Sequence, residues 1–300
     1  MKISFLLNWY LNPYHAPIIV AKEMGFYSER NIDLAIIEPT NPSDVTHLIG
    51  QGDIPLGLKA MVHCYAARGR GFKVKSIGTL LDEPPTGLIA LKHKNINHIT
   101  DIKGKRIGYV GEFGKVMVDN LASEAGLTPN DYTTVRTGMD AAHALINDKV
   151  DAAIGLSCFQ QVEIQEQGFE STMLRIDEAA HLGCCCFCSI LFITHEKFIK
   201  THPDLLSEFM RATLAGLQVT REDPEKALSC LFAVKPGLDT PLYKKIFYHT
   251  LPYFSRDLLN VERDWRKVGK YAQKLGIIAQ ENDFKECFTH AFAPVDLCPV

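Results

Sequence analysis

A lysine and a histidine stand four positions apart where a predicted strand ends. Lys59 follows the apolar run 54–58, and His63 comes one helical turn later. If a helix begins there, the i,i+4 spacing brings both side chains to one face. A lysine desolvated at the cleft end of a strand has a lowered pKa and can form a Schiff base with an aldehyde, within reach of the histidine. A surface lysine beside a partly buried, hydrogen-bonded histidine explains the same residues.

A glycine-containing turn is a candidate site for an anion. The segment GEFGK lies between a predicted strand over 106–110 and a predicted helix over 116–125. Glycines let consecutive backbone N–H groups face one anion, the helix dipole adds a positive end, and the lysine would add a point charge. The spacing is not that of a Walker loop, and an ordinary strand-to-helix turn is the alternative. The residues of this feature are Gly111, Glu112, Phe113, Gly114 and Lys115.

Four cysteines fall within five consecutive positions: Cys184, Cys185, Cys186 and Cys188. Neighbouring side chains on an extended segment point opposite ways, so all four cannot easily bind one ion, and the CxxC spacing of structural zinc sites is absent. Two or three thiolates on one side, completed by a histidine, a water or a partner chain, would suit iron. Packing of small buried side chains where the chain crosses between domains is the alternative.

Asn8 and Trp9 end the first predicted strand, over residues 2–8, and should point into a cleft. A tryptophan placed there would stack on a planar ligand ring, although core packing is an equally ordinary role. His15 begins the next predicted helix, and the same two roles, contact with a ligand and core packing, are open for it.

Strands and helices alternate over the first 90 residues of the chain. A βαβαβ order predicts a parallel sheet, whose ligands bind outside the carboxyl ends of the strands. From about residue 92 the pattern starts again, and after residue 194 it becomes mostly helical. The predicted strands are 2–8, 34–38, 54–58, 73–81, 87–91, 106–110, 133–136, 152–156, 172–176 and 189–194. The predicted helices are 15–24, 43–48 (capped by Ser43), 99–103, 116–125, 140–147, 160–167, 203–217, 224–232, 240–251 and 259–275.

Two apolar crossings, near 87–91 and 189–194, bracket a self-contained α/β unit. We therefore expect an inserted domain II over 89–189, and a discontinuous domain I made of residues 1–88 and 190–300. This connectivity is that of a two-lobed, periplasmic-binding-protein-like (type II) α/β fold, in which each domain has three layers and a ligand cleft lies between them.

Composition excludes several classes of protein. Of 300 residues 46% are hydrophobic, and 32 Lys and Arg against 35 Asp and Glu give a formal net charge of −3. That balance carries no electrostatic signature of nucleic-acid or anionic-membrane binding. The apolar run at 3–7 is too short for a secretory signal or a membrane span. The expected location is the cytoplasm, with no nucleic-acid or membrane partner.

Taken together, the motifs resemble those of the fungal-type synthases of 4-amino-5-hydroxymethyl-2-methylpyrimidine phosphate (HMP-P), the pyrimidine precursor of thiamine. The similarity extends over most of the chain up to about residue 275, and the combination of GCCCFC, GEFGK and the Lys59–His63 pair is highly specific. The matching strings are FLLNW (5–9), EPTNPSDVT (38–46), GLKAM followed by His63 (57–63), IGYVGEFGK (107–115), LRID (174–177), GCCCFC (183–188) and RDW (263–265).

This resemblance implies unusual chemistry. Pyridoxal 5′-phosphate (PLP) would form an imine with Lys59 and be consumed as a substrate, with its phosphate on the backbone of Gly111–Gly114. His63 would be the second substrate and give atoms of its imidazole to the product, so each polypeptide would act once. The four clustered cysteines would take part in binding iron, which works with dioxygen, and the chain would form a homodimer. The alternatives are a non-catalytic two-lobed binding protein for a thiamine pyrimidine precursor and, less favoured, a conventional PLP enzyme with turnover.

Overall fold

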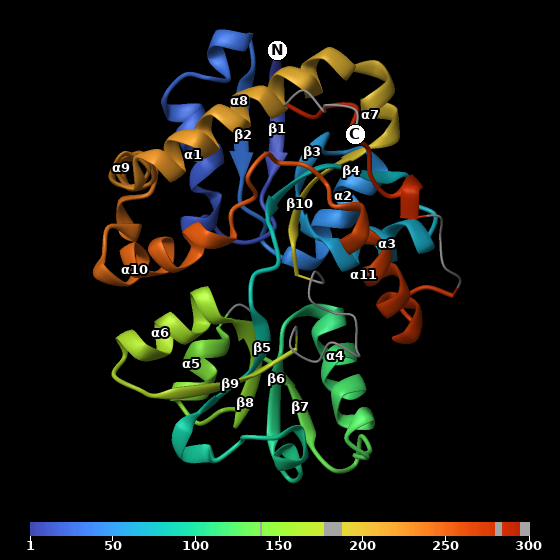
Figure 1. Ribbon diagram of the computed structural model, residues 1–300, viewed down its shortest axis with the longest axis vertical. Helices are drawn as coiled ribbons and strands as arrows, with labels where there is room; N and C mark the ends of the chain where they lie inside the picture. The colour runs from blue at the N-terminus through green and yellow to red at the C-terminus, as the bar shows by residue number, and fades with distance from the viewer. Residues whose placement is uncertain (139, 177–187, 280–283, 295–300) are drawn as a thin grey trace.

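The computed structural model describes residues 1–138, 140–176, 188–279 and 284–294, which form two lobes stacked along the longest axis (Figure 1). Each lobe is built on one five-stranded sheet. The chain enters the second lobe with β5 (Thr86–Leu91) and is back in the first with β10 (Ile190–His195). The predicted domain boundary between residues 88 and 89 falls within β5.

The sheet of the first lobe has the strand order β2-β1-β3-β10-β4. β1 pairs in parallel with β2 and β3, as the βαβαβ order predicts. β10 runs antiparallel to β3 and β4, because it returns from the other lobe and not through a crossover helix. The strands other than β10 are β1 (Lys2–Leu6), β2 (Asp33–Ile37), β3 (Leu56–Ala60) and β4 (Val74–Leu81).

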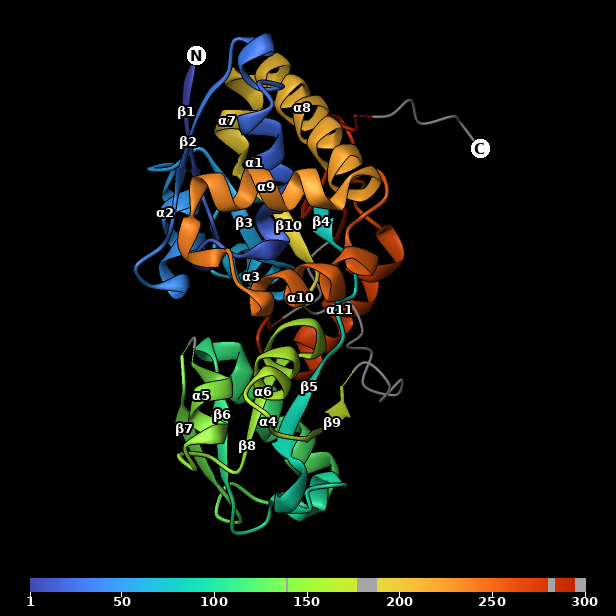
Figure 2. The same ribbon diagram turned by 90° about the vertical axis from the view of Figure 1, so that its left-hand side faces the viewer.

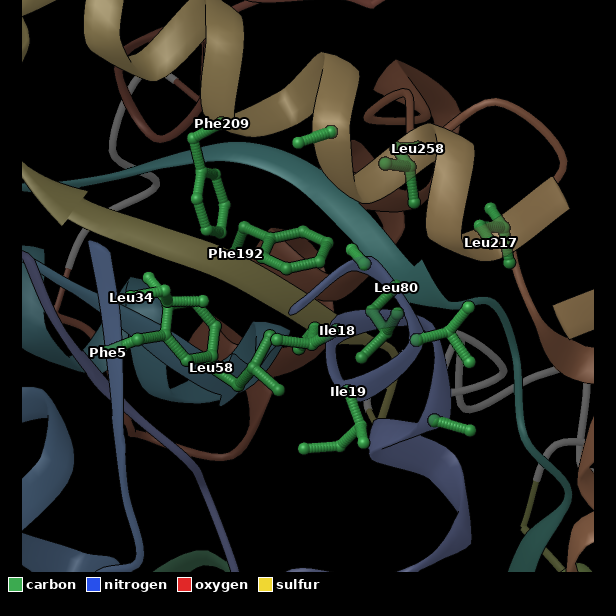
Figure 3. Packing of buried hydrophobic residues seen from close by; sticks show 14 of the residues in the cluster. Phe5, Ile18, Ile19, Leu34, Leu58, Leu80, Phe192, Phe209, Leu217 and Leu258 are labelled. Atoms are coloured by element: carbon green, nitrogen blue, oxygen red, sulfur yellow. The ribbon is translucent and has the colours of Figure 1, made fainter. Parts of the chain in front are cut away.

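Side chains of this sheet alternate between two apolar layers, which explains why the strands are buried on both faces. Phe5 and Phe192 pack under α1 (Ala16–Glu23) and α8 (Pro203–Glu222). Leu6 and Leu191 face the other side, which is covered by α2 (Val45–Gln51), α3 (Met61–Gly69) and α11 (Glu262–Lys274). Figure 3 shows Phe192 beside Phe209 of α8, with ring centroids 5.9 Å apart. Burying each such ring contributes about 1.5–3 kcal/mol. This packing holds β3, and with it the side chains at its carboxyl end.

Helices cover both faces of the first lobe's sheet (Figures 1 and 2). Within the described residues no helix is both long and apolar enough to cross a membrane. The helices of this lobe are α1 (Ala16–Glu23), α2 (Val45–Gln51), α3 (Met61–Gly69), α7 (Glu196–Thr201), α8 (Pro203–Glu222), α9 (Pro224–Val234), α10 (Pro241–Thr250) and α11 (Glu262–Lys274).

The second lobe repeats the three-layer arrangement on a smaller scale, with the strand order β7-β6-β8-β5-β9. β6 is parallel to β7 and β8, while β5 is antiparallel to β8 and β9. Leu88 packs on the α4 side and Ile89 on the side of α5 and α6. The elements other than β5 are β6 (Arg106–Tyr109), β7 (Thr133–Arg136), β8 (Ala152–Leu156), β9 (Ser171–Arg175), α4 (Gly111–Glu124), α5 (Ala141–Ile146) and α6 (Val162–Glu166).

Short helical turns complete the described chain, and one of them corrects a predicted cap. Ser43 does not cap the helix after it, because residues Pro42–Asp44 form a 3-10 turn in which Asn41 Oδ1 accepts from the Ser43 N–H (3.1 Å). The other turns are Pro13–His15, Ser28–Arg30, Lys92–Lys94, Ile99–Ile102, Pro236–Leu238, Leu251–Tyr253, Phe284–Glu286 and the π-helical Ser157–Gln161.

Candidate functional site

A pocket of about 220 Å³ lies between the two lobes and is lined by side chains of both. The carboxyl end of β3 and the start of α3 line it from the first lobe. The start of α4, the ends of β7 and β8 and the following turn line it from the second. Its position outside the carboxyl ends of parallel strands is where open α/β sheets bind ligands.

Lys59 brings a buried amine to this pocket. It lies within β3, one residue before the strand ends, and is 5% exposed. Its Nζ donates a hydrogen bond to the Pro42 carbonyl. Burial disfavours the ammonium form and lowers the pKa of Lys59 from 10.5 to about 8. The side chain is therefore a much better nucleophile at neutral pH than an exposed lysine.

His63 lies in the first turn of α3 and also lines the pocket. Its ring meets Phe113 of the second lobe edge-on, with centroids 4.7 Å apart. Burial, with the charges of Lys59 and Arg70, lowers the pKa of His63 well below 6.5, so the imidazole is neutral. Because Lys59 belongs to the strand, the two residues do not share a helix face as the spacing suggested. The strand-to-helix junction brings both to the pocket instead.

The segment GEFGK is not a loop before a helix, as predicted, but the beginning of α4 itself. Val110 provides no side-chain cap, and uncapped N–H groups at the start of a helix are typical partners of anions. Gly111 has φ +63°, a backbone conformation that favours glycine. Gly111, Phe113 and Gly114 line the pocket, and the Glu112 backbone forms part of the same helical turn. This end of the pocket suits an anion.

Lys115 is not among the pocket-lining residues, and its ammonium pairs with Asp119 at 2.5 Å. The structure brings a different cation to the pocket, Arg136 at the end of β7. Arg136 is exposed, and within the described parts of the chain no ion pair or hydrogen bond occupies its guanidinium. Sequence reasoning missed it, although a basic residue that ends a parallel strand was the available signal.

Aromatic and apolar side chains form the walls of the pocket. Asn8 and Trp9 both line it, but β1 ends at Leu6, so they lie in the turn after the strand and not within it. Trp9 is half-buried, and its ring lies tilted against Tyr10 with centroids 5.8 Å apart. Sequence reasoning missed Tyr14, Met117, Ile154, Leu156, Phe159 and Gln160. Such walls fit a flat ring.

One of the four clustered cysteines lies among the described residues. Cys184, Cys185 and Cys186 lie outside the described residues, whereas Cys188 is half-buried and lines the pocket. Among the residues that the structure does describe, no group of three or more His, Cys, Asp or Glu side chains is arranged to hold a metal ion. The thiol of Cys188 and the imidazole of His63 are nevertheless donor types that iron accepts, and both line the pocket.

The fold and the site together define a periplasmic-binding-protein-like protein whose interlobe pocket contains a buried lysine, a neutral histidine and the start of a helix that has no side-chain cap. The alkanesulfonate-binding protein SsuA from Xanthomonas axonopodis pv. citri is similar over 96% of this chain and 98% of its own, with a TM-score of 0.75 and 13% identity. The Candida albicans CA3427 gene product, described as having the generic periplasmic binding protein fold, covers 99% of this chain and 98% of its own, with a TM-score of 0.72 and 15% identity. These likenesses confirm the predicted fold class.

Sequence similarity identifies the family. The NMT1/THI5 like family matches residues 12–227, and the chain belongs to it. A 4-amino-5-hydroxymethyl-2-methylpyrimidine phosphate synthase from Legionella pneumophila is 54% identical over 98% of this chain and 92% of its own length. A synthase of the same name from Schizosaccharomyces pombe is 48% identical over 99% of this chain and 88% of its own length. The predicted resemblance is thereby confirmed.

Proposed function

We propose that the chain is an HMP-P synthase of thiamine biosynthesis. Relatives that bear this name are similar over nearly the whole chain and over most of their own lengths. The observation that carries the proposal is the convergence of Lys59, His63 and the start of α4 on one pocket between the lobes. A protein that only binds a ligand does not need a lysine and a histidine buried beside the start of a helix.

The first substrate in this proposal is PLP. Its aldehyde condenses with the Lys59 amine, forming a C=N bond and releasing one water. Its phosphate accepts from the first N–H groups of α4, with Arg136 as the countercharge. Among the described side chains that line the pocket, Lys59 and Arg136 are the cations and none is a carboxylate, which supports an anionic ligand. Phe113, Met117 and Trp9 provide flat or apolar surfaces for the ring.

The second substrate is the side chain of His63 itself. A neutral imidazole keeps its lone pair available, and contact with Phe113 restricts the orientation of the ring. Holding both reactants in one pocket replaces a bimolecular encounter with a positioned one. Since the reaction consumes the histidine, each polypeptide acts once.

Opening two aromatic rings is an oxidation, and iron with dioxygen would supply the oxidising chemistry. In the proposal Cys184, Cys185, Cys186 and Cys188 contribute ligands for iron. Cys188 supports this assignment by its place in the pocket. Cytoplasmic location and a homodimer stay predictions from the sequence.

The stoichiometry of a single incubation tests the function. With PLP, ferrous iron and dioxygen, the protein should release at most one equivalent of HMP-P, and mass spectrometry should find His63 altered in proportion. Product beyond one equivalent with His63 intact would contradict the single-use mechanism. Reversible binding of a free pyrimidine with no product at all would favour the alternative, a binding protein like its structural neighbours.

Replacing Arg136 by Met should weaken PLP binding by about tenfold, the lower end of what a charge-assisted hydrogen bond provides, because the guanidinium is exposed. The loss should shrink as salt is added. Titration of the variant with PLP, against the exposed control Arg221→Met, measures it. Unchanged affinity in R136M together with a tenfold loss in Lys115→Met would assign the phosphate to Lys115 instead.

A further inference from the structure

Four buried residues form a hydrogen-bonded group at one wall of the pocket. Asn8 and Tyr14 line the pocket and are 8% and 6% exposed, while Asn12 and His15 behind them are fully buried. The Asn12 backbone N–H bonds His15 Nδ1 at 3.2 Å, and His15 Nε2 lies 3.2 Å from Asn8 Oδ1. Asn8 Nδ2 in turn donates to Tyr14 Oη at 3.2 Å. None of the roles proposed above uses Asn12 or His15.

The direction of each bond in this group follows from the first one. A backbone N–H can only donate, so His15 Nδ1 is the acceptor and carries no proton. Burial and the charge of Lys235 lower the pKa of His15 to about 3, so the ring is neutral and its proton is on Nε2. Nε2 therefore donates to Asn8 Oδ1, which fixes which end of the amide is the oxygen.

The orientation of the Asn8 amide also determines which hydrogen-bonding groups line the pocket. Asn8 Nδ2 carries two protons, and Tyr14 Oη accepts one of them. The Tyr14 hydroxyl, whose pKa burial raises, stays protonated and must direct its own proton elsewhere. Within the described residues neither that O–H nor the second Asn8 N–H has an acceptor, and both groups line the pocket.

We infer that His15 is a positioning residue that makes this wall a pair of hydrogen-bond donors, Asn8 Nδ2–H and Tyr14 Oη–H, which select ligands carrying a lone-pair acceptor on the edge of an aromatic ring. PLP, the ligand of the proposed function on which this step rests, has two such acceptors, the ring nitrogen and the 3-oxygen. With His15 in the other tautomer, or with a flipped Asn8, the wall would present an oxygen and repel both.

Binding of PLP and of two analogues tests the selection. One analogue lacks the 3-oxygen, and the other has CH in place of the ring nitrogen. The wild-type protein should bind PLP at least about tenfold more tightly than one of these analogues, which identifies the acceptor. In Asn8→Asp the carboxylate accepts from both His15 and Tyr14, so PLP affinity should fall. The ratio of the affinity for PLP to the affinity for that analogue should then approach one. The exposed control Asn130→Asp should keep the wild-type ratio; an unchanged ratio in N8D would overturn the inference.

Two substitutions of His15 separate positioning from folding. Both His15→Gln and His15→Phe remove the imidazole that accepts from the Asn12 N–H and should lower the melting temperature. Only the glutamine can still donate to Asn8 Oδ1, so H15Q should keep discrimination between PLP and the analogue while H15F loses it. Equal ratios in the two variants would overturn the positioning role.

The ligand-free protein provides a test that does not depend on PLP. Nitrogen-15 NMR should find His15 as the neutral Nε2–H tautomer from pH 5 to pH 9. A charged ring or the Nδ1–H tautomer would overturn the inference even if PLP binds. If PLP does not bind while the Nε2–H tautomer is found, the proposed function fails and the donor wall stands, with its ligand to be sought among other aromatic acceptors.

Discussion

The His63→Asn variant is expected to bind PLP at Lys59 and to form no HMP-P. Asparagine keeps a polar group near the position of Nδ1 and fits the first turn of α3, so the pocket walls and Lys59 should be retained. An acid or base in this position would leave residual activity when replaced, because water or a neighbour can carry a proton. A side chain that donates atoms has no substitute. The measurement is HMP-P by mass spectrometry, beside the imine absorbance of bound PLP.

His143→Asn is the matched control, because His143 is an exposed helical histidine that does not line the pocket. It should form one equivalent of HMP-P, like the unmodified protein. Any HMP-P from H63N, made while PLP is bound, would show that His63 is not the source of its atoms. Loss of both PLP binding and product would instead indicate a damaged pocket, which the melting temperature of H63N distinguishes.

Much of the fold follows from the sequence, because its elements have strong local patterns. Strands β7 and β8 have their predicted bounds, and α8 to α11 begin within three residues of their predicted starts. Buried strands with apolar residues on both faces are recognisable without knowledge of their neighbours. The same patterns could not reveal that β10 pairs antiparallel with β3 and β4, since strand order is decided by packing between distant segments.

That Lys59, His63 and the glycines of GEFGK belong to one candidate site was predictable for a different reason. Lys59, His63 and the glycines at the start of α4 occur in distinctive short motifs, and the structure brings all of them to one pocket. Gly111 is an example, because its positive φ is a backbone conformation that favours glycine and is set by the local chain alone. The start of α4 was misplaced by five residues because glycines in GEFGK suggest a turn, whereas here they form the first helical turn.

What remained hidden are residues whose role depends on the second lobe facing the first. Arg136 ends a short, polar strand with nothing unusual in its sequence, and Tyr14 and Phe159 resemble ordinary core aromatics. Lys115, in contrast, has the right type and position in the sequence, but Asp119 one turn later competes for its charge. Only the three-dimensional structure shows that Arg136 lines the pocket and that Lys115 does not.

The pH dependence of PLP attachment should report the environment of Lys59. Only the neutral amine attacks an aldehyde, and a pKa near 8 rather than 10.5 makes that form roughly 300-fold more abundant at pH 7. Because burial lowers this pKa, the attachment rate should rise about tenfold per pH unit below pH 8 and level off above it. Stopped-flow absorbance between pH 6 and pH 10 measures it. A midpoint near 10.5 would mean that the amine is solvated in the protein.

Lys59→Ala should remove the imine absorbance altogether, and with it the formation of HMP-P, since the aldehyde then has no partner at this end of the pocket. Lys59→Arg should behave in the same way although it keeps a positive charge, because a guanidinium stays protonated and forms no imine. The contrast separates covalent attachment from charge attraction: noncovalent PLP should bind K59R more tightly than K59A. Lys75→Ala, on strand β4 of the same sheet and outside the pocket, should retain both absorbance and product. An imine band that survives in K59A would place the attachment on another lysine and deprive the buried amine of the role proposed for it.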